Sequence, residues 1–234
     1  MLAILKRELS AYFNSAIGYI VLAVFYFFSG MYFYLYCLYY GSASLTPVFA
    51  NMFMIVLFLI PIITMKSFSE EKRQKTDQAL LTAPVNLFEV VMGKFLGAFT
   101  LYALCVAIFL VFTLVICFFT TPDWAVILCT ILGMLLLGGA LIAIDIFVSA
   151  LTESQVIAAV ISIAVGLLVY MIDSLASITQ SQFLINILSA LSFNSNFNNF
   201  TYGILDFSNV VFFLSVIAIF IFLTIRVFEK KRWS

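Results

Sequence analysis

The sequence predicts an all-α membrane protein with six transmembrane helices. Of its 234 residues, 65% are hydrophobic and only 9% are charged, whereas a soluble domain is about half apolar and about a quarter charged. Six apolar stretches reach or approach the roughly 20 residues that a helix needs to cross a bilayer. All 11 basic residues lie on one side of those stretches. We therefore expect residues 1–234 to form a single transmembrane domain.

The expected spans are joined by short connections, except for the longer segments before the third span and before the last. They cover residues 17–40, 48–65, 95–119, 125–151, 156–172 and 209–227. Pro61 lies inside the second stretch, where its missing backbone donor is expected to kink the helix. The first stretch is longer than the apolar core of a signal peptide, about 7 to 15 residues, and no cleavage site follows it. We therefore expect the N-terminus to be retained.

The basic residues set the expected orientation. The segments at 41–46, 120–124 and 173–208 contain no Lys or Arg. The other three segments contain all of them: Lys6 and Arg7, then Lys66, Lys72, Arg73, Lys75 and Lys94, then Arg226, Lys230, Lys231 and Arg232. Because basic segments stay on the cytoplasmic side, both termini are predicted to face the cytoplasm from a plasma or inner membrane.

The first 15 residues have the pattern of an amphipathic helix. One face carries Lys6, Arg7 and Glu8, and apolar residues recur at helical spacing at Leu2, Leu5, Leu9, Tyr12 and Phe13. Such a helix lies in the membrane interface, and we expect an elbow helix before the first span. A simple positively charged flank is the alternative.

The segment between the second and third spans carries the richest pattern of charges. Glu71 and Lys75 are four residues apart, as are Arg73 and Asp77, a spacing that stabilises a helix. Thr82-Ala83-Pro84 would end it, so a charged helix is predicted over 69–81. An isolated helix of this length is marginal in water, which favours docking into a partner over a solvated loop helix.

The long segment 173–208 is too apolar for a loop and too polar for a span. One helical stripe contains Phe183, Leu184, Ile187, Leu188 and Leu191, and further phenylalanines follow among asparagines at Phe193, Phe197, Phe200 and Phe207. Irregular backbone is tolerated near a membrane only where protein or water satisfies it. We therefore expect short re-entrant helices, dipping into the outer leaflet, before the last span.

The residue types exclude most chemistry. Histidine, the commonest general base, is absent, and the four cysteines lie in apolar runs without Cys-x-x-Cys spacing. Gly93-Lys94 lacks the rest of a phosphate-binding loop, and Glu70-Glu71 lacks the histidines that an intramembrane protease would need. The net charge is zero, which gives no sign of nucleic-acid binding. No catalytic residue, metal site or cofactor is predicted in this chain.

Asp145 is the one carboxylate well inside a predicted span. A charge there is costly and is usually functional or paired. No Lys or Arg occurs in a span core, so its partner must be a hydroxyl, an amide, water or a proton. Two interpretations stay open, a proton or transport role and a structural role for a protonated or water-linked side chain.

Several segments resemble the permeases of exporter-type ABC transporters, the ABC-2 family. They are residues 68–76 (FSEEKRQKT), 80–85 (LLTAPV) and 93–94, the region of the family's coupling helix, with 6–9 (KREL), 149–155 (SALTESQ) and 203–206 (GILD). The gliding-motility permeases resemble the chain most, and those of nitrous-oxide-reductase maturation next. Two departures are Lys75 to Gln78, where the family commonly has Gly-Thr-Leu-Glu, and Asp145, where it tends to have a small residue.

The resemblance implies a permease subunit of an ATP-driven exporter. It implies two ATP-binding subunits that hold ATP and Mg, a second permease subunit, identical or different, membrane lipids around the spans, and room for an accessory extracytoplasmic protein. It places elbow contacts at Lys6, Arg7 and Glu8. It places contacts with the ATPase at Glu70, Glu71, Arg73, Lys75, Thr76, Leu80 and Leu81. A membrane scaffold without transport and an intramembrane enzyme are the alternatives.

Overall fold

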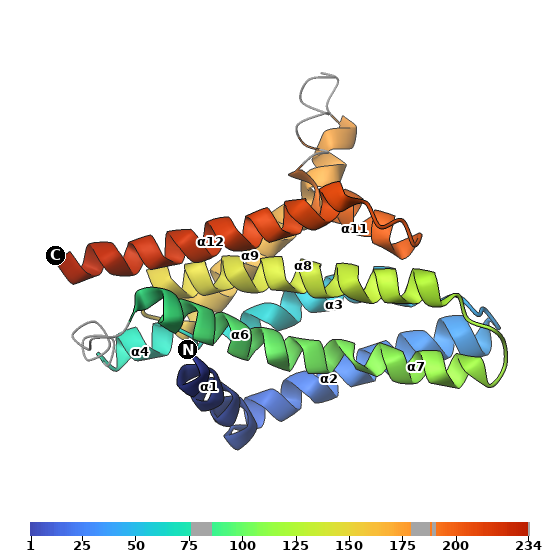
Figure 1. Ribbon diagram of the computed structural model, residues 1–234, viewed down its shortest axis with the longest axis horizontal. Coiled ribbons are helices and arrows are strands. Elements are labelled where there is room, and N and C mark those ends of the chain that lie inside the picture. Colours follow the sequence, from blue (N-terminus) through green and yellow to red (C-terminus); the bar gives the residue numbers. More distant parts are fainter. Residues whose placement is uncertain (76–85, 179–187, 189–190, 234) are drawn as a thin grey trace.

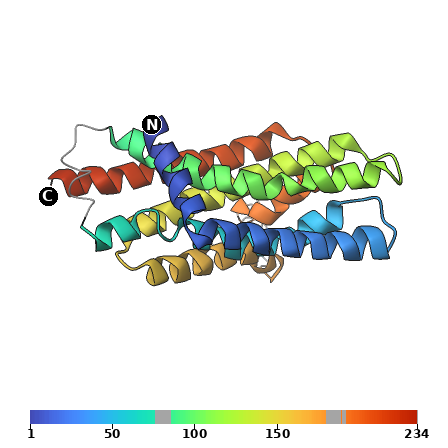
Figure 2. The same ribbon diagram turned by 90° about the horizontal axis from the view of Figure 1, so that it is seen from below.

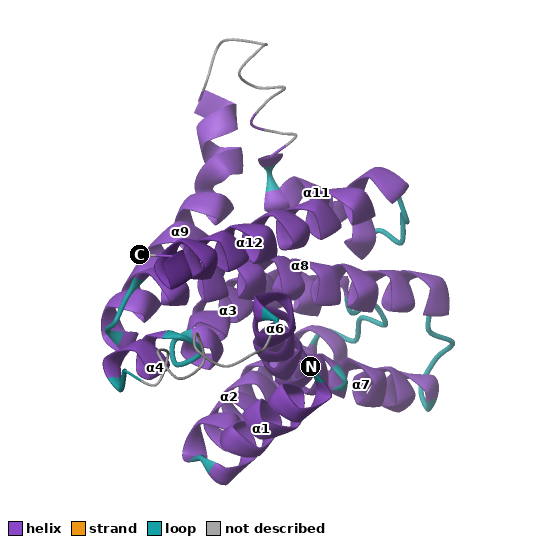
Figure 3. Ribbon diagram, turned by 60° about the vertical axis from the view of Figure 1, so that its left-hand side comes forward, coloured by secondary structure: helices purple, strands orange, loops and turns teal. Residues whose placement is uncertain are grey.

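A computed structural model describes residues 1–75, 86–178, 188 and 191–233. Within these ranges every regular element is a helix (Figure 3). Six helical stretches are long and apolar enough to cross a membrane, so the predicted number is confirmed. They are Ala16–Tyr39, Thr46–Arg73, Leu87–Cys117, Trp124–Leu151, Gln155–Ile172 and Phe207–Arg232.

The helices form an elongated bundle with both chain termini at one end (Figure 1). We call this the basic end, because all the basic residues that the structure describes lie in the segments that meet there; the opposite end is the far end. The elements in chain order are α1 (Leu2–Asn14), α2 (Ala16–Phe33), the π-helix η1 (Tyr34–Tyr39), α3 (Thr46–Thr64), α4 (Ser69–Arg73), α6 (Leu87–Val106), α7 (Ile108–Cys117), α8 (Trp124–Leu151), α9 (Gln155–Ile178), α11 (Phe193–Thr201) and α12 (Phe207–Trp233).

Side-chain caps explain where several helices begin. The amide oxygen of Asn86 accepts a hydrogen bond from the backbone N–H of Phe88 at 3.1 Å. The carboxylate of Asp123 accepts from Ala125 and Val126, and the hydroxyl of Ser192 accepts from Ser195 at 2.9 Å. Each cap satisfies a backbone donor that has no partner inside its helix.

Helix α8 lies at the centre of the bundle. It packs against α3, α6, α9, α11 and α12, and Figure 1 shows α12 running alongside it. Two glycines allow this close packing: a Cβ at Gly138 would lie 2.1 Å from the Tyr102 ring, and one at Gly133 would lie 2.6 Å from Phe200. Tyr102 also donates its hydroxyl hydrogen to the Met134 carbonyl at 2.9 Å. Small residues let membrane helices approach closely where no hydrophobic force drives them together.

Some helix boundaries differ from those that the hydropathy predicts. The third span begins at Leu87 instead of residue 95 and is interrupted at Ala107, between α6 and α7. The helix starts there because the Asn86 side chain caps it, and Lys94 lies buried within the helix, paired with carboxylates. The second span continues through Pro61 to Thr64 as one helix. Helix α9 continues past residue 172 to Ile178.

Helix α11 fills the gap between the far ends of α8, α9 and α12. Its side chains Phe193, Phe197 and Phe200 are buried, and its backbone is held by Thr130, whose hydroxyl donates to the Phe200 carbonyl at 3.0 Å. Most of the predicted stripe at 183–191 lies outside the described residues. The insertion of this region into a leaflet stays a prediction.

Candidate functional site

Helix α1 lies across α6 at the basic end (Figure 2). The contact depends on two glycines four residues apart. A Cβ at Gly93 would lie 2.8 Å from the side chain of Ile4, and one at Gly97 would lie 2.9 Å from the Cβ of Glu8. This Gly-x-x-x-Gly surface allows the two backbones to approach closely. It brings Glu8 next to Lys94, which lies about one turn before Gly97 on α6.

Four charged side chains from three helices meet beside this contact, and we call them the four-charge cluster: Arg7 and Glu8 of α1, Glu71 of α4, and Lys94 of α6. The Lys94 ammonium lies 3.0 Å from Glu8 Oε1 and 2.9 Å from Glu71 Oε1. The Arg7 guanidinium contacts the same two oxygen atoms at 2.9 and 3.0 Å. Two positive and two negative charges make the cluster neutral.

Lys94 is the buried member of the four-charge cluster, with 2% of its side chain exposed. Its ammonium has three donors, and it has three acceptors, the two carboxylates and the Ser67 carbonyl at 2.6 Å. It also lies over the Phe68 ring, 5.0 Å from the centroid. A buried charge is tolerated when its partners replace the lost water, so Lys94 depends on Glu8 and Glu71 together.

Arg7 lies at the exposed edge of the cluster, with 57% of its side chain accessible. Its hydrogen bond to Glu8 and the nearby Glu71 carboxylate raise its pKa above the ordinary value, against the opposing effect of burial. Arginine keeps its charge in proteins, and Glu71 is shared between a buried cation and an exposed one.

The N-terminus of α4 is capped by a residue of α8. The Ser149 hydroxyl oxygen accepts hydrogen bonds from the backbone N–H groups of Phe68 and Ser69, both at 3.1 Å. These are donors that a helix start leaves without an internal partner. On the same side, the Lys72 ammonium donates to the Ala150 carbonyl. Helix α4 is thus attached to α8 as well as to α1 and α6.

The predicted helix over 69–81 is not continuous. Helix α4 ends at Arg73, and Lys75 follows with a left-handed backbone, at φ 56°. Left-handed residues commonly end helices, because they turn the chain so that the last carbonyls find donors. Thr76, Leu80 and Leu81 lie outside the described residues.

The other predicted contact residues divide into exposed and engaged groups. Arg73 and Lys75 are exposed, as is Lys6 on α1. Glu70 is partly exposed and accepts a hydrogen bond from Gln74 at 3.4 Å. Glu71, Arg7 and Glu8 are instead engaged in the four-charge cluster. The structure thus separates side chains available to a partner from those that hold α4 in place.

Asp145 lies at the junction of α8, α3 and α9, with 3% of its surface exposed. Two buried hydroxyls, of Thr64 and Ser162, interact with its carboxyl group. Its Oδ2 atom has no hydrogen-bond partner among the described residues. The structure therefore supplies hydroxyl groups as partners, as one of the predicted options, and brings no described cation to it.

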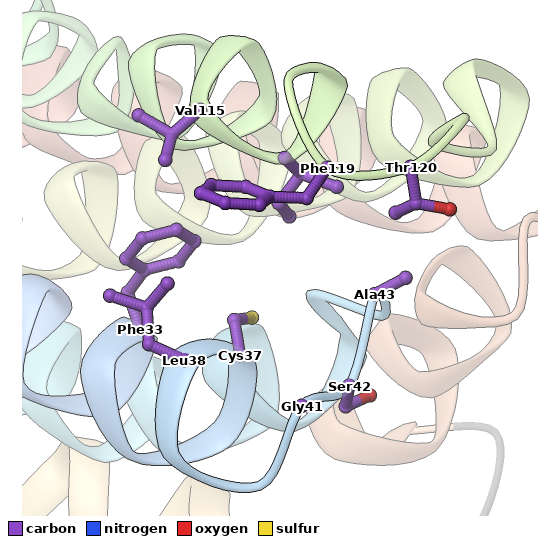
Figure 4. Close-up of a pocket in the computed structure, with 10 residues that line it drawn as sticks. Phe33, Cys37, Leu38, Gly41, Ser42, Ala43, Val115, Phe119 and Thr120 are labelled. Carbon is purple, nitrogen blue, oxygen red and sulfur yellow. The ribbon is translucent and has the colours of Figure 1, made fainter.

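An apolar cavity of about 400 Å³ opens at the far end, between the end of α2 with η1 and the end of α7 (Figure 4). Phe33, Cys37, Val115 and Phe119 line it, with the hydroxyl of Thr120 at its edge. None of its described lining residues is charged. The described lining therefore provides no carboxylate, imidazole or amine.

Sequence reasoning missed three structural features on which this site depends. The spacing of Gly93 and Gly97 was a readable signal for close helix packing. No sequence signal indicated that Lys94 is buried, because a charge next to an apolar stretch is normally interpreted as the membrane boundary. The capping role of Ser149 follows only from the packing of α8 against α4.

The described polar groups of this site form ion pairs and a helix cap that join α1, α4, α6 and α8. The parts of the chain that the structure describes contain no cluster of three or more His, Cys, Asp or Glu side chains that could hold a metal. The charged side chains of the four-charge cluster are paired with one another, and no nucleophile and general base converge beside them among the described residues.

Comparison with known proteins identifies the family of the chain. The profile of the family described as ABC-2 family transporter protein matches residues 2–233, nearly the whole chain. None of the curated proteins matches it. Permeases of this family have no ATPase activity of their own and generally pair with ABC ATPase subunits. The chain belongs to the ABC-2 family of transporters and is a multi-pass permease subunit.

Proposed function

We propose that this permease is half of an ATP-driven exporter in which α4 receives the force of ATP hydrolysis. The observation that carries the proposal is the attachment of α4 to three separate helices, through Glu71 to α1 and α6 and through Ser149 to α8. A five-residue helix has no stability of its own, so α4 moves with the helices that hold it.

Transmission begins at the exposed residues of the α4 segment. Arg73 and Lys75 are free of ion pairs within the described chain and can meet acidic or carbonyl groups of an ATPase. A displacement of α4 pulls Glu71 against Lys94, and because Lys94 lies within α6, that helix must tilt or the ion pair must break. Ser149 passes the same displacement to α8, at the centre of the bundle.

The proposal includes the wider assembly. Two ATPase subunits bind ATP and Mg, and a second permease, identical or different, completes the translocator. The further resemblance to gliding-motility permeases is a finer prediction that the match to the whole family does not test.

The proposed orientation places the basic end in the cytoplasm. Single cysteines at the exposed positions Ser44 and Thr121 should then react with a membrane-impermeant maleimide added outside cells, whereas a cysteine at Lys75 should not. The background needs Cys117→Ser, since Cys117 is the exposed native cysteine among the described residues. If only the Lys75→Cys variant were labelled from outside, the protein would have the opposite orientation.

The docking assignment is tested by charge reversal. Arg73→Glu and Lys75→Glu should each lower the amount of ATPase subunit that co-purifies with the tagged permease, by about tenfold for one charge-assisted contact. Arg232→Glu, an exposed cation on α12 at the same end, is the matched control. Equal co-purification from all three variants would refute docking at α4.

A further inference from the structure

A second cavity lies at the basic end, between α1, the end of α3 and α4. Its volume is about 540 Å³, within the range of small-ligand sites. Charged and polar side chains line one part, among them Lys66, Ser67 and Glu70, and apolar side chains line another, among them Ile17, Ile62 and Ile63. The cavity therefore suits a ligand that is polar at one end and apolar at the other.

The position of the cavity along the bundle indicates where such a ligand would come from. Ile17 stands near the start of the first span, and Ile62 and Ile63 stand near the end of α3. Ile62 has 42% of its surface exposed. Apolar spans give way to charged residues at this level, which is the level of lipid headgroups in a bilayer.

Three polar groups of the cavity have capacity left for a ligand. Lys66 forms no ion pair with any residue that the structure describes. The hydroxyl of Ser67 is buried and has no hydrogen-bond partner in the described chain. Within the described residues, Glu70 accepts one long hydrogen bond, from Gln74 at 3.4 Å. The cavity thus offers a cation, a hydroxyl donor and a carboxylate, in addition to the paired charges of the four-charge cluster.

We propose that this cavity binds one zwitterionic phospholipid of the phosphatidylethanolamine type. The phosphate group is held by Lys66 and Ser67, the ammonium group by Glu70, and the acyl chains leave along Ile17 and Ile62. Charge-assisted hydrogen bonds to phosphate and to ammonium are the strong ones in such a site. A free anion would use only the cationic part and would leave Glu70 opposed to it.

Arg73 and Lys75, through which we propose that the ATPase docks, do not line the cavity, whereas Glu70 and Glu71, which the family resemblance also assigns to the ATPase, do line it. The proposal stands without the proposed function. A lipid bound here would touch α1, α3 and α4 together and would fill the space beneath the elbow that the protein itself leaves open.

The test measures lipid binding to the purified full-length permease by native mass spectrometry, with phosphatidylethanolamine, phosphatidylglycerol and inorganic phosphate as probes. We expect one phosphatidylethanolamine per chain. Lys66→Gln should lower the affinity for both lipids by about tenfold. Glu70→Gln should lower the affinity for phosphatidylethanolamine alone, also by about tenfold. Arg232→Gln and Glu153→Gln alter exposed charges elsewhere at the same end and should change neither affinity.

Three results would overturn the proposal. Unchanged binding in Lys66→Gln and Glu70→Gln would show that the lipid sits elsewhere. Competition by inorganic phosphate as strong as that by lipid would reveal a simple anion site. Displacement of the bound lipid by the purified ATPase subunit would assign the cavity to that subunit.

Discussion

The two ends of the bundle are held together by different forces. At the basic end, α1, α4, α6 and α8 meet through ion pairs and caps, with Lys94 2.9 Å from Glu71 and Ser149 bonded to the start of α4. At the far end, aromatic contacts take the place of ion pairs among the described residues, alongside hydrogen bonds such as that from Thr130 to the Phe200 carbonyl. Phe33 stacks on Phe112 at 4.5 Å between ring centroids, and three buried phenylalanines hold α11 in place.

The difference matters for motion. Aromatic and aliphatic packing scales with buried area and is spread over many contacts, so loss of one contact leaves the rest. Ion pairs and caps are directional and few, and each depends on its partner. A movement of α4 can therefore break individual ion pairs at the basic end or pull the paired helices with it. The helices of the far end should instead move together, because many contacts join them.

The largest expected effect comes from removing Lys94. The substitution Lys94→Met leaves the carboxylates of Glu8 and Glu71 close together with only exposed Arg7 between them, which should cost about 2–4 kcal/mol. Denaturant unfolding in detergent, followed by helical circular dichroism, measures it. Lys6→Met, an exposed lysine on α1, is the control. A loss below about 1 kcal/mol would mean that the cluster is a surface feature.

The second comparison uses three glycines. Gly97→Ala at the basic end and Gly133→Ala at the far end both place a Cβ within 3 Å of a neighbouring side chain, and each should cost about 1–3 kcal/mol. Gly30→Ala meets nothing within 4 Å and should be neutral or stabilising, since alanine favours helix by about 1 kcal/mol. Thermal unfolding ranks the three. We expect Gly97→Ala, but not Gly133→Ala, also to lower ATPase stimulation, and equal effects on stimulation would remove the distinction between the ends.

Ser149→Ala should have a smaller and local effect. It removes the acceptor for two α4 backbone donors, at a cost of about 1 kcal/mol. Hydrogen exchange should therefore speed up over residues 69–73 and nowhere else. Ser215→Ala is the control, because Ser215 is exposed and bonds only within its own helix. Unchanged exchange at α4 would contradict the capping role.

Asp145→Asn should have the smallest effect if the side chain is structural. The amide keeps the shape and can still bond to Thr64 and Ser162, so stability should change by no more than about 1 kcal/mol. At each pH from 6 to 8, the ATPase activity of the assembled variant complex should equal that of the native complex. Loss of a pH dependence that the native complex shows would instead support a proton-transfer role.

The sequence predicts the bundle better than it predicts the site. Apolar length indicates six helices because a span must satisfy its own backbone and face lipid, which is a local property. The four-charge cluster joins Arg7, Glu71 and Lys94 from distant segments, and no local pattern pairs them. Lys94 in particular looks like a loop residue until its two carboxylates are placed beside it.

The continuity of the α4 segment shows the same limit. Charge spacing predicts a helix from residue 69 onward, and α4 does begin there, yet it ends at Arg73, just before the left-handed backbone of Lys75 turns the chain. The motif 149–155, chosen for its resemblance to the family, turns out to supply the Ser149 cap.

A double-mutant cycle between Glu71 and Lys94 tests the central claim most directly. The permease would be reconstituted with its ATPase subunits in lipid, and ATPase stimulation compared for Glu71→Gln, Lys94→Met and the two combined. If the pair links α4 to α6, each single variant should lose stimulation and the combined variant should lose no more than either, a coupling of about 1 kcal/mol or greater. Additive losses would show that the two residues act separately and would contradict the account.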